Sequence, residues 1–336
     1  MKYSDEEKEK LLDYMSELTL EELAEFVAVH EFDQVRTKAD YRRLFQSLLS
    51  QGKLTYTVLT EFLDKIGPTR SQHVFLLKGP TGLAKEWRNE TFATKRMSDA
   101  GVISLSEKRT SLILPTELTL SRIAYSKQRL QVFAVARREG EYRDKKRDFN
   151  QDEDGEHVLY KAYVESVERG LVMLDWNLLD STATLHITQL PSGMEYSAER
   201  GAIADLLKPW LDISQFDTLE IPKAIKALHA LAEKGQAEAR PQAIDYKTAG
   251  GRTAGGRGAS TGTSVLGEAI VDRAMKDFRE NGVAHIGNFW WLPNKGLPEQ
   301  EIHVFLNGPD NRVNFTTRNT QGTINYVLDR IRAHCA

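Results

Sequence analysis

Residues 73–80 read His-Val-Phe-Leu-Leu-Lys-Gly-Pro, and they divide the chain into two regions with different hydrophobic periods. The run from Val74 to Leu77 is short, apolar and ended by Gly79-Pro80, which is the pattern of a buried β-strand followed by a turn. Before this run, apolar residues recur every three or four positions, whereas several later runs alternate. The stretch therefore predicts that a helical region gives way to a sheet near residue 70.

The first 70 residues have the pattern of four or five short helices. Thr19 and Glu22 form a capping box that starts one of them. Gly67-Pro68 ends the last, because proline cannot continue a helix. Short one-sided helices must bury their apolar faces against one another, so residues 1–70 are expected to form a small antiparallel bundle. Their 14 Asp/Glu against 10 Lys/Arg make this bundle acidic.

Residues 71–234 are predicted to form a middle α/β domain with a mostly antiparallel sheet. Beyond the first strand at 73–78, its strands are expected at the apolar or alternating runs 102–105, 111–115, 129–137, 157–164, 170–176 and 182–189, and a helix is expected over 83–97. Asp154-Gly155 is a turn signal between two of them. Helices at 198–210 and 223–234 are expected to close the domain.

The composition changes between residues 235 and 264, where Gly, Ala, Thr, Arg and Gln dominate. The stretch 250–258 reads Gly-Gly-Arg-Thr-Ala-Gly-Gly-Arg-Gly. Such a composition buries too little apolar surface to offset the entropy of ordering the chain. We therefore predict a flexible Gly/Arg-rich linker over 235–264.

The remaining residues, 265–336, are predicted to form a C-terminal module. One helix around Ile270 and Phe278, three strands and a closing helix from about Ile324 give the order α-β-β-β-α. Double-stranded RNA-binding domains have the same order and hold phosphates with a Lys cluster before the last helix. Here that position holds Arg318 as its one cation.

The overall fold class predicted from these regions is α+β.

Composition restricts the class of protein and its location. The chain has 336 residues with 40% hydrophobic and 28% charged residues, so it is expected to fold into more than one domain. No apolar run approaches the length of about 20 residues that spans a bilayer. The first residues carry no signal for secretion, and the one cysteine, Cys335, cannot form an internal disulfide. We expect a cytoplasmic protein, or a nuclear one if the source is eukaryotic, without membrane contact.

No motif predicts a cofactor or a metal. Gly79 to Lys85 lacks the adjacent Gly-Lys-Ser/Thr of a phosphate-binding loop. The segment from Asn150 to Gly155 has the spacing that opens a calcium loop, but the twelfth position holds Lys161 where a bidentate Glu is needed. An acidic hairpin tip is the better interpretation. The eight histidines show no metal-binding spacing. An active site assembled from distant residues leaves no such signature, so an enzyme stays possible.

The segment 122–147 is the strongest functional signal, with nine Lys/Arg against three acids. Such a cluster attracts a phosphate backbone. The alternative is a solvated loop neutralised by the acids just beyond it, from Asp148 to Asp154. The candidate nucleic-acid-binding residues are Arg129, Arg137, Arg138, Arg143, Lys145, Lys146 and Arg147.

A second candidate surface is Trp290-Trp291, which follows Phe289. Exposed tryptophans favour protein interfaces, since a large ring is buried there at low entropic cost. At least one of the two rings is expected to pack in the core. We predict a protein-interface role for Trp290 and Trp291.

Residues 18–80, from Leu18-Thr-Leu-Glu-Glu-Leu23 to Val74-Phe-Leu-Leu-Lys-Gly-Pro80, resemble the N-terminal part of centromere protein N. The resemblance lies in the order of helices, strand and Lys-Gly-Pro. It implies a pyrin-like death fold followed by an α/β domain. It also implies a non-enzymatic protein that docks on DNA or chromatin through basic residues and on a partner through the rest. No individual site residue is transferred from it.

These observations lead to three hypotheses about function. The first is a non-enzymatic modular interaction protein, an adaptor or assembly component, with a death-fold-like bundle for protein contacts. The second is a nucleic-acid-binding protein that uses the basic segment 122–147. The third is an enzyme with a dispersed active site.

Overall fold

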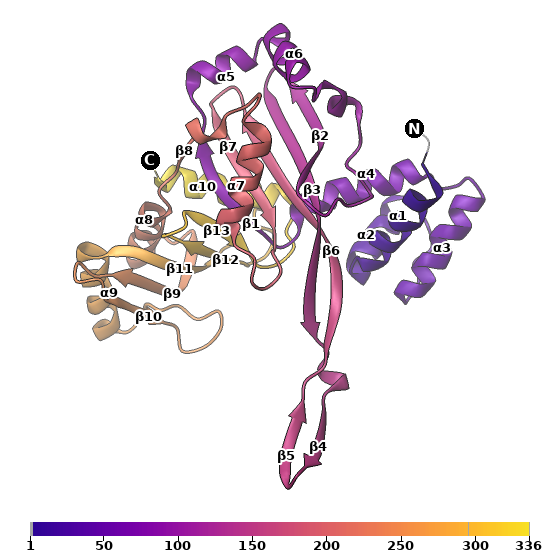
Figure 1. The fold of residues 1–336 in the computed structure, drawn as a ribbon. Coiled ribbons are helices and arrows are strands. Elements are labelled where there is room, and N and C mark those ends of the chain that lie inside the picture. The colour runs from indigo at the N-terminus through magenta and orange to yellow at the C-terminus, as the bar shows by residue number, and fades with distance from the viewer. Residues whose placement is uncertain (1–2, 295, 336) are drawn as a thin grey trace.

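The computed structural model describes residues 3–294 and 296–335, and over these residues the protein is an α+β structure. Ten α-helices and a large antiparallel sheet make up this part of the chain. A helical bundle lies to one side of the sheet, and a long hairpin projects away from both (Figure 1). None of the helices described combines the length and hydropathy required to cross a bilayer.

The N-terminal bundle contains four helices, as the hydrophobic spacing predicts. They are α1 (Asp5–Glu17), α2 (Leu20–Val29), α3 (Lys38–Ser50) and α4 (Tyr56–Ile66). Each begins after a Ser or Thr whose side-chain oxygen accepts a hydrogen bond from a first-turn N–H. The predicted capping box of Thr19 and Glu22 is present. In the core, the ring of Phe26 packs against Phe45 and Phe62 at centroid distances of 5.4 and 4.9 Å.

A single sheet of eleven described strands runs through the rest of the protein. The strands are β1 (Gln72–Lys78), β2 (Thr119–Ser126), β3 (Arg129–Arg143), β6 (Tyr163–Asn177), β7 (Thr182–Thr188), β8 (Asp217–Thr218), β9 (Ala239–Lys247), β10 (Thr253–Arg257), β11 (Val283–Trp291), β12 (Ile302–Asn307) and β13 (Arg312–Phe315). Their order is β10-β9-β11-β12-β13-β1-β7-β6-β3-β2, with β8 beside β1. All of these pairings are antiparallel.

Helices cover the sheet over two cores. The helices α5 (Thr81–Trp87), α6 (Glu90–Asp99) and α7 (Tyr196–Leu207) enclose a core with β1, β2, β3, β6 and β7 in which Trp87 contacts Trp176 and Trp210. The second core lies under α8 (Ile221–Glu233), α9 (Ala269–Asn281) and α10 (Gln321–Cys335). Short 3₁₀ helices η1 (Gly67–Thr69), η2 (Ile103–Glu107), η3 (Lys145–Arg147) and η4 (Ile213–Gln215) connect other elements. The predictions of strands at 102–105 and 111–115 are wrong, because η2 occupies most of the first run and the second run forms no strand.

The prediction of a flexible linker over 235–264 is wrong, because β9 and β10 lie within it and join the sheet. Ile244 and Tyr246 of β9 are fully buried. The glycines of β10 allow close approach: a Cβ at Gly255 would lie 2.3 Å from the carbonyl oxygen of Ile244. One at Gly256 would lie 2.6 Å from Val265. Here the Gly-rich composition serves tight packing.

The C-terminal order α-β-β-β-α is confirmed by α9, β11, β12, β13 and α10. This part of the chain shares its sheet with the N-terminal strand, because β1 pairs with β13 along one edge and with β7 along the other. Val74 lies opposite both Val313 and His186. The strand quoted first in the sequence therefore joins the two halves of the sheet.

Candidate interaction surface

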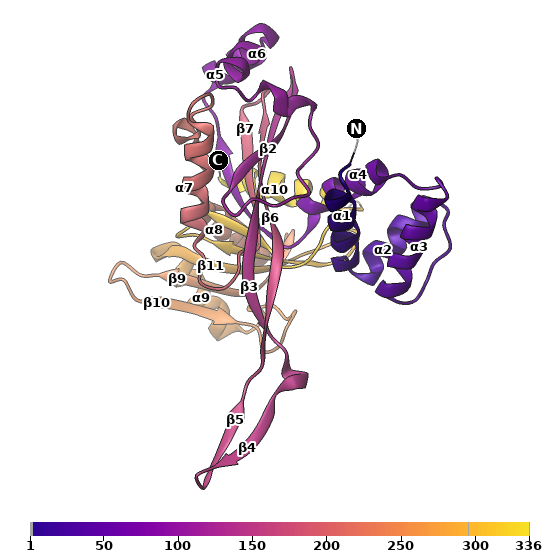
Figure 2. The same ribbon diagram turned by 45° about the vertical axis from the view of Figure 1, so that its right-hand side comes forward.

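A long hairpin extends beyond the sheet. β3 and β6 pair from Arg129 opposite Asn177 to Arg143 opposite Tyr163. β2 accompanies β3 only as far as Val135, and β7 begins to accompany β6 only at Val172. Beyond Arg138 and Arg169, which still contact other elements, the two strands continue as a ribbon that stands clear of the rest in both views (Figures 1 and 2). We call residues 139–168 the arm.

The outer part of the arm is a second, smaller hairpin. After η3, the strands β4 (Phe149–Glu153) and β5 (Glu156–Tyr160) pair only with each other. The residues Asp154 and Gly155 have φ values of 50° and 84°, which is the backbone of a tight two-residue hairpin turn. The predicted acidic hairpin tip is therefore confirmed.

Over the side chains that the structure describes, no hydrophobic core lies beneath the arm. Four large apolar side chains are exposed along it: Phe149 (55% exposed), Leu159 (53%), Tyr163 (58%) and Val167 (46%). The ring of Phe149 stacks on Tyr160 at 4.8 Å, a contact within the arm. A two-stranded hairpin alone is at best marginally stable in water. The arm exposes these apolar side chains without a core to cover them, and it is therefore the candidate interaction surface.

Charges on the arm are separated along its length. Residues 139–168 contain ten Asp/Glu against five Lys/Arg, so the arm is acidic overall. Four of the five cations lie in residues 143–148, which we call the elbow, together with Asp144 and Asp148. Residues 152–156, the tip, hold four carboxylates and no Lys or Arg. The elbow is therefore positive and the tip strongly negative.

The basic segment 122–147 does not form one basic surface. Seven of its nine cations lie within 4 Å of a carboxylate, and they belong to the pairs Arg122–Asp64, Lys127–Glu90, Arg129–Asp175, Arg137–Glu139, Arg138–Glu199, Arg143–Asp148 and Arg147–Asp144. Among the described residues, Lys145 and Lys146 have no carboxylate within that distance. Lys145 and Lys146 are therefore the two cations of the predicted patch that lie outside these pairs.

The prediction that Arg138 binds nucleic acid is wrong, because its side chain is buried. It is 3% exposed, and it donates to Glu199 Oε1 at 2.6 Å and to Thr188 Oγ1 at 2.8 Å. A Cβ at Gly170 would lie 2.4 Å from its Nε, so the glycine makes room for the guanidinium. Arg138 holds α7 against the sheet. Arg129 also has a carboxylate partner, since its guanidinium donates two hydrogen bonds to Asp175.

The prediction of a tryptophan interface is wrong for Trp291, which is fully buried in the C-terminal core. Trp290 is half-buried, and its Nε1–H donates to Gln242 Oε1 at 2.7 Å. Adjacent residues on a strand point to opposite faces of the sheet, so the two rings cannot share one surface. Core packing of one ring is confirmed.

The bundle is joined to the sheet region by pairs of carboxylates and arginines. Glu7 meets Arg109, and Asp64 meets both Arg122 and Arg169 at 3.4 and 3.6 Å. The Tyr14 hydroxyl also donates to the Leu112 carbonyl, at 2.8 Å. In each ion pair the carboxylate belongs to the bundle and the arginine follows it in the chain. Part of the bundle's acidic excess therefore serves this junction.

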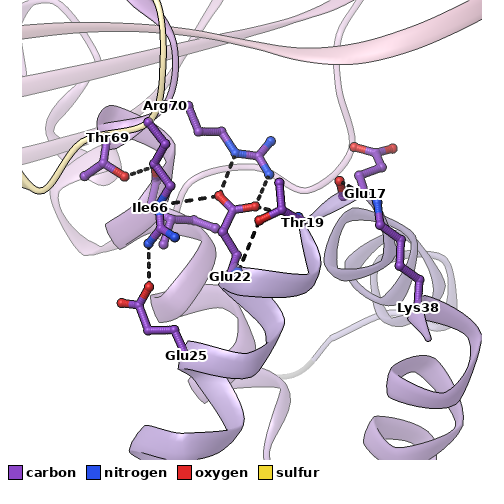
Figure 3. A network of polar contacts seen from close by, with 9 residues as sticks. Glu17, Thr19, Glu22, Glu25, Lys38, Ile66, Thr69 and Arg70 are labelled. Carbon is purple, nitrogen blue, oxygen red and sulfur yellow. Dashed lines mark hydrogen bonds and ion pairs between the residues drawn. The ribbon is translucent and has the colours of Figure 1, made fainter. Parts of the chain in front are cut away.

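Glu22 is the most buried carboxylate of the junction, at 1% exposure (Figure 3). It accepts a hydrogen bond from the backbone N–H of Thr19 at 2.7 Å and two from Arg70 at 3.3 and 3.4 Å. Arg318 adds its Nε at 3.7 Å and pairs with Glu25 at 2.6 Å. Burial alone raises the pKa of Glu22, but the Thr19 hydrogen bond and the two arginines outweigh it and lower the pKa. Arg318 is the one cation at the position where double-stranded RNA-binding domains hold phosphates. Its guanidinium is instead paired with Glu22 and Glu25.

The hydrogen bond that most resembles a catalytic base–nucleophile pair joins His186 and Thr184 on β7. The ring of His186 contacts Thr184 Oγ1 at 2.9 Å and Gln72 Oε1 at 2.8 Å, beside a hollow of about 490 Å³. Burial lowers the pKa of His186 to about 4, which leaves a weak base. Thr184 lies in mid-sheet between Leu76 and Asp175, so its backbone N–H lies within the sheet and offers no oxyanion hole. The contact is structural. Over residues 3–294 and 296–335, no three His, Cys, Asp or Glu side chains gather as metal ligands.

Neither a scan against models of protein families nor a search of curated proteins finds a match to the chain. The functional argument therefore depends on the geometry of the described residues. Sequence reasoning did not predict the arm, although it located the turn at Asp154-Gly155 and strands on both sides of it. The signal that was available in the sequence is the presence of the apolar residues Phe149, Leu159 and Tyr163 in a segment that also holds ten Asp/Glu.

Proposed function

We propose that this chain is a non-enzymatic interaction protein whose arm is its main contact with a partner protein. The observation that carries the proposal is the projection of the arm beyond the sheet with four exposed large apolar side chains. Such side chains raise the free energy of the isolated arm in water and lower it when a partner covers them. The bundle, in this proposal, is a death-fold-like support that is docked on the sheet.

The resemblance of residues 18–80 to centromere protein N also supports a binding role. Relationship to that family is part of the proposal. The ion pairs of the junction support a rigid arrangement in which the bundle and the base of the arm keep a constant distance. A partner that touches both would then meet a preformed surface.

The test is photo-cross-linking in the source cells. A benzophenone amino acid replaces Phe149 in one variant and Ile270, a 79% exposed side chain on α9, in the control. We expect a discrete cross-linked protein from position 149 and none of the same mass from position 270. Equal cross-linking at both positions would contradict the proposal, because it would show that exposure alone determines capture.

A second candidate function is nucleic-acid binding through the elbow, which the unpaired and exposed Lys145 and Lys146 favour. Fluorescence anisotropy with labelled duplex DNA, duplex RNA and single strands measures this binding across a salt series. The Lys145→Glu/Lys146→Glu variant should bind at least about tenfold more weakly at low salt. The matched control is Lys234→Glu/Lys247→Glu, two exposed lysines outside the arm, at the ends of α8 and β9. Equal loss in the control, or no binding at low salt, rejects this function.

A further inference from the structure

Among the described strands, none pairs with either outer edge of the β4–β5 hairpin. β4 bonds to β5 alone and β5 to β4 alone, and neither touches the eleven-stranded sheet. Every second residue of such an edge directs its N–H and C=O groups outward, where another strand can bond to them. The outer edge of β4 continues directly from the elbow, since Arg147 ends η3 and Phe149 begins β4. A strand that adds to this edge therefore also passes the elbow.

The charges of the hairpin match those of a second hairpin in antiparallel orientation. The elbow carries Arg143, Lys145, Lys146 and Arg147 against two aspartates, and the tip carries four carboxylates. Two hairpins side by side in parallel orientation would bring the two tips together, where like charges repel. In antiparallel orientation each tip meets the other copy's elbow, so one arm complements itself.

The register follows from this match. A two-fold axis through Gln151 places Phe149 of one copy opposite Glu153 of the other. The elbow, which precedes Phe149, then lies beside the turn at Asp154-Gly155 of the other copy, where the tip carboxylates are. The same axis keeps Phe149, Gln151 and Glu153 of both copies on one face of the new sheet, because alternate residues of a strand share a face. The stacked rings of Phe149 and Tyr160 from the two copies then flank a four-stranded ribbon. This is an isologous contact, the commonest type in homodimers.

We propose that β4 pairs with β4 of a second copy of this chain, with each acidic tip lying against the other copy's basic elbow. The inference depends on the proposed function, because it names a partner for the same arm. The occupant is a second copy, since the basic elbow, the acidic tip and the free edge of β4 that fit one another all lie on one chain. The contact is small, so the dimer is expected to form reversibly with protein concentration.

Sedimentation velocity of the full chain over a concentration series is the direct test. We expect a monomer–dimer equilibrium whose dissociation constant rises about tenfold or more in the tip reversal Asp152→Lys/Asp154→Lys/Glu156→Lys, and also in the elbow reversal Lys145→Glu/Lys146→Glu. An equimolar mixture of the two reversed chains should associate again, because each supplies the charge that the other lacks. A wild-type chain that stays monomeric at every concentration, or a mixture that stays monomeric, overturns the proposal.

A cross-link checks the register independently of charge. Gln151→Cys places two thiols on the two-fold axis at the distance of a directly opposed strand pair, so mild oxidation should join two chains through this position. The control is Glu139→Cys, an exposed position at the base of the arm, and the native Cys335 is buried. Equal yield of joined chains at 139 and 151 rejects the β4 register.

The two proposals fail in different ways. A monomeric chain that still gives a discrete cross-link from position 149 to another protein rejects self-pairing and leaves the arm as a partner-binding surface. A dimer that dissociates in both reversals, with no other protein cross-linked at position 149, supports self-pairing as the arm's contact. The absence of both results rejects both proposals.

Discussion

The junction of the bundle and the arm use charged residues in opposite ways. At the junction, carboxylates of the bundle meet arginines of the rest of the chain one by one, as Glu22 does with Arg70 and Arg318. On the arm, four of the five cations lie at the elbow, where Arg143 and Arg147 pair with aspartates but Lys145 and Lys146 do not, and four of the ten carboxylates lie at the tip. Charges that are neutralised within the chain fix its shape, whereas charges left separated act on other molecules.

The apolar side chains of the junction and the arm also differ, because those of the junction are buried and those of the arm are exposed. At the junction, Leu112 lies in the core of the bundle although it is far away in sequence. On the arm, Leu159 and Val167 face solvent. The comparison predicts that substitutions at the junction change stability and that substitutions on the arm change association.

The largest expected effect is at Glu22. Glu22→Ala removes the capping contact with Thr19 and leaves Arg70 and Arg318 without their buried partner, so we expect a loss of about 2–3 kcal/mol in the free energy of unfolding. Urea denaturation followed by circular dichroism measures it. The matched control is Glu21→Ala, the exposed neighbour in the same helical turn. If both variants lose the same free energy, the ion pairs of the junction do not stabilise the bundle.

The second effect is the pH dependence of the same contact. Because the pKa of Glu22 is lower in the folded protein than its ordinary value, its stabilising contribution is complete above that ordinary value. The contribution is lost as the pH falls through the lower, folded pKa. The difference in unfolding free energy between wild type and Glu22→Gln should therefore shrink as the pH falls below about 4.5. Thermal unfolding at several pH values measures this difference. A difference that stays constant or grows in acid would show that the pKa of Glu22 is not lowered by folding.

The smallest effect is expected from removal of the outer arm. Arg143 and Tyr163 lie opposite each other, so a two-residue Asn-Gly turn can replace residues 144–162 and close the hairpin. No core side chain is removed, and the melting temperature should change by no more than about 2 °C. Association should be abolished in the same variant. A strongly lowered melting temperature would show that the arm supports the fold and would remove the contrast with the junction.

Local features were predictable from the sequence because their causes lie within a few residues. The capping box at Thr19 and Glu22, the turn at Asp154-Gly155 and the closing helix from Ile324 all follow from near neighbours. The linker prediction failed because composition cannot distinguish glycines that give flexibility from those that allow close packing, as Gly255 does. The prediction of one basic surface over 122–147 failed for a similar reason, because Arg138 pairs with Glu199, a residue that comes near it only in the folded chain.

By itself, the sequence determined the helical bundle, the change to strands at residue 73, the acidic turn and the C-terminal α-β-β-β-α order, because hydrophobic period and turn chemistry act locally. Only the tertiary structure decided which charges are neutralised and which strands project. Arg318 and Glu25 pair across 293 positions, and β1 pairs with β13 from the far end of the chain. Such contacts depend on where the whole chain packs, and no local pattern encodes a distance between residues so far apart.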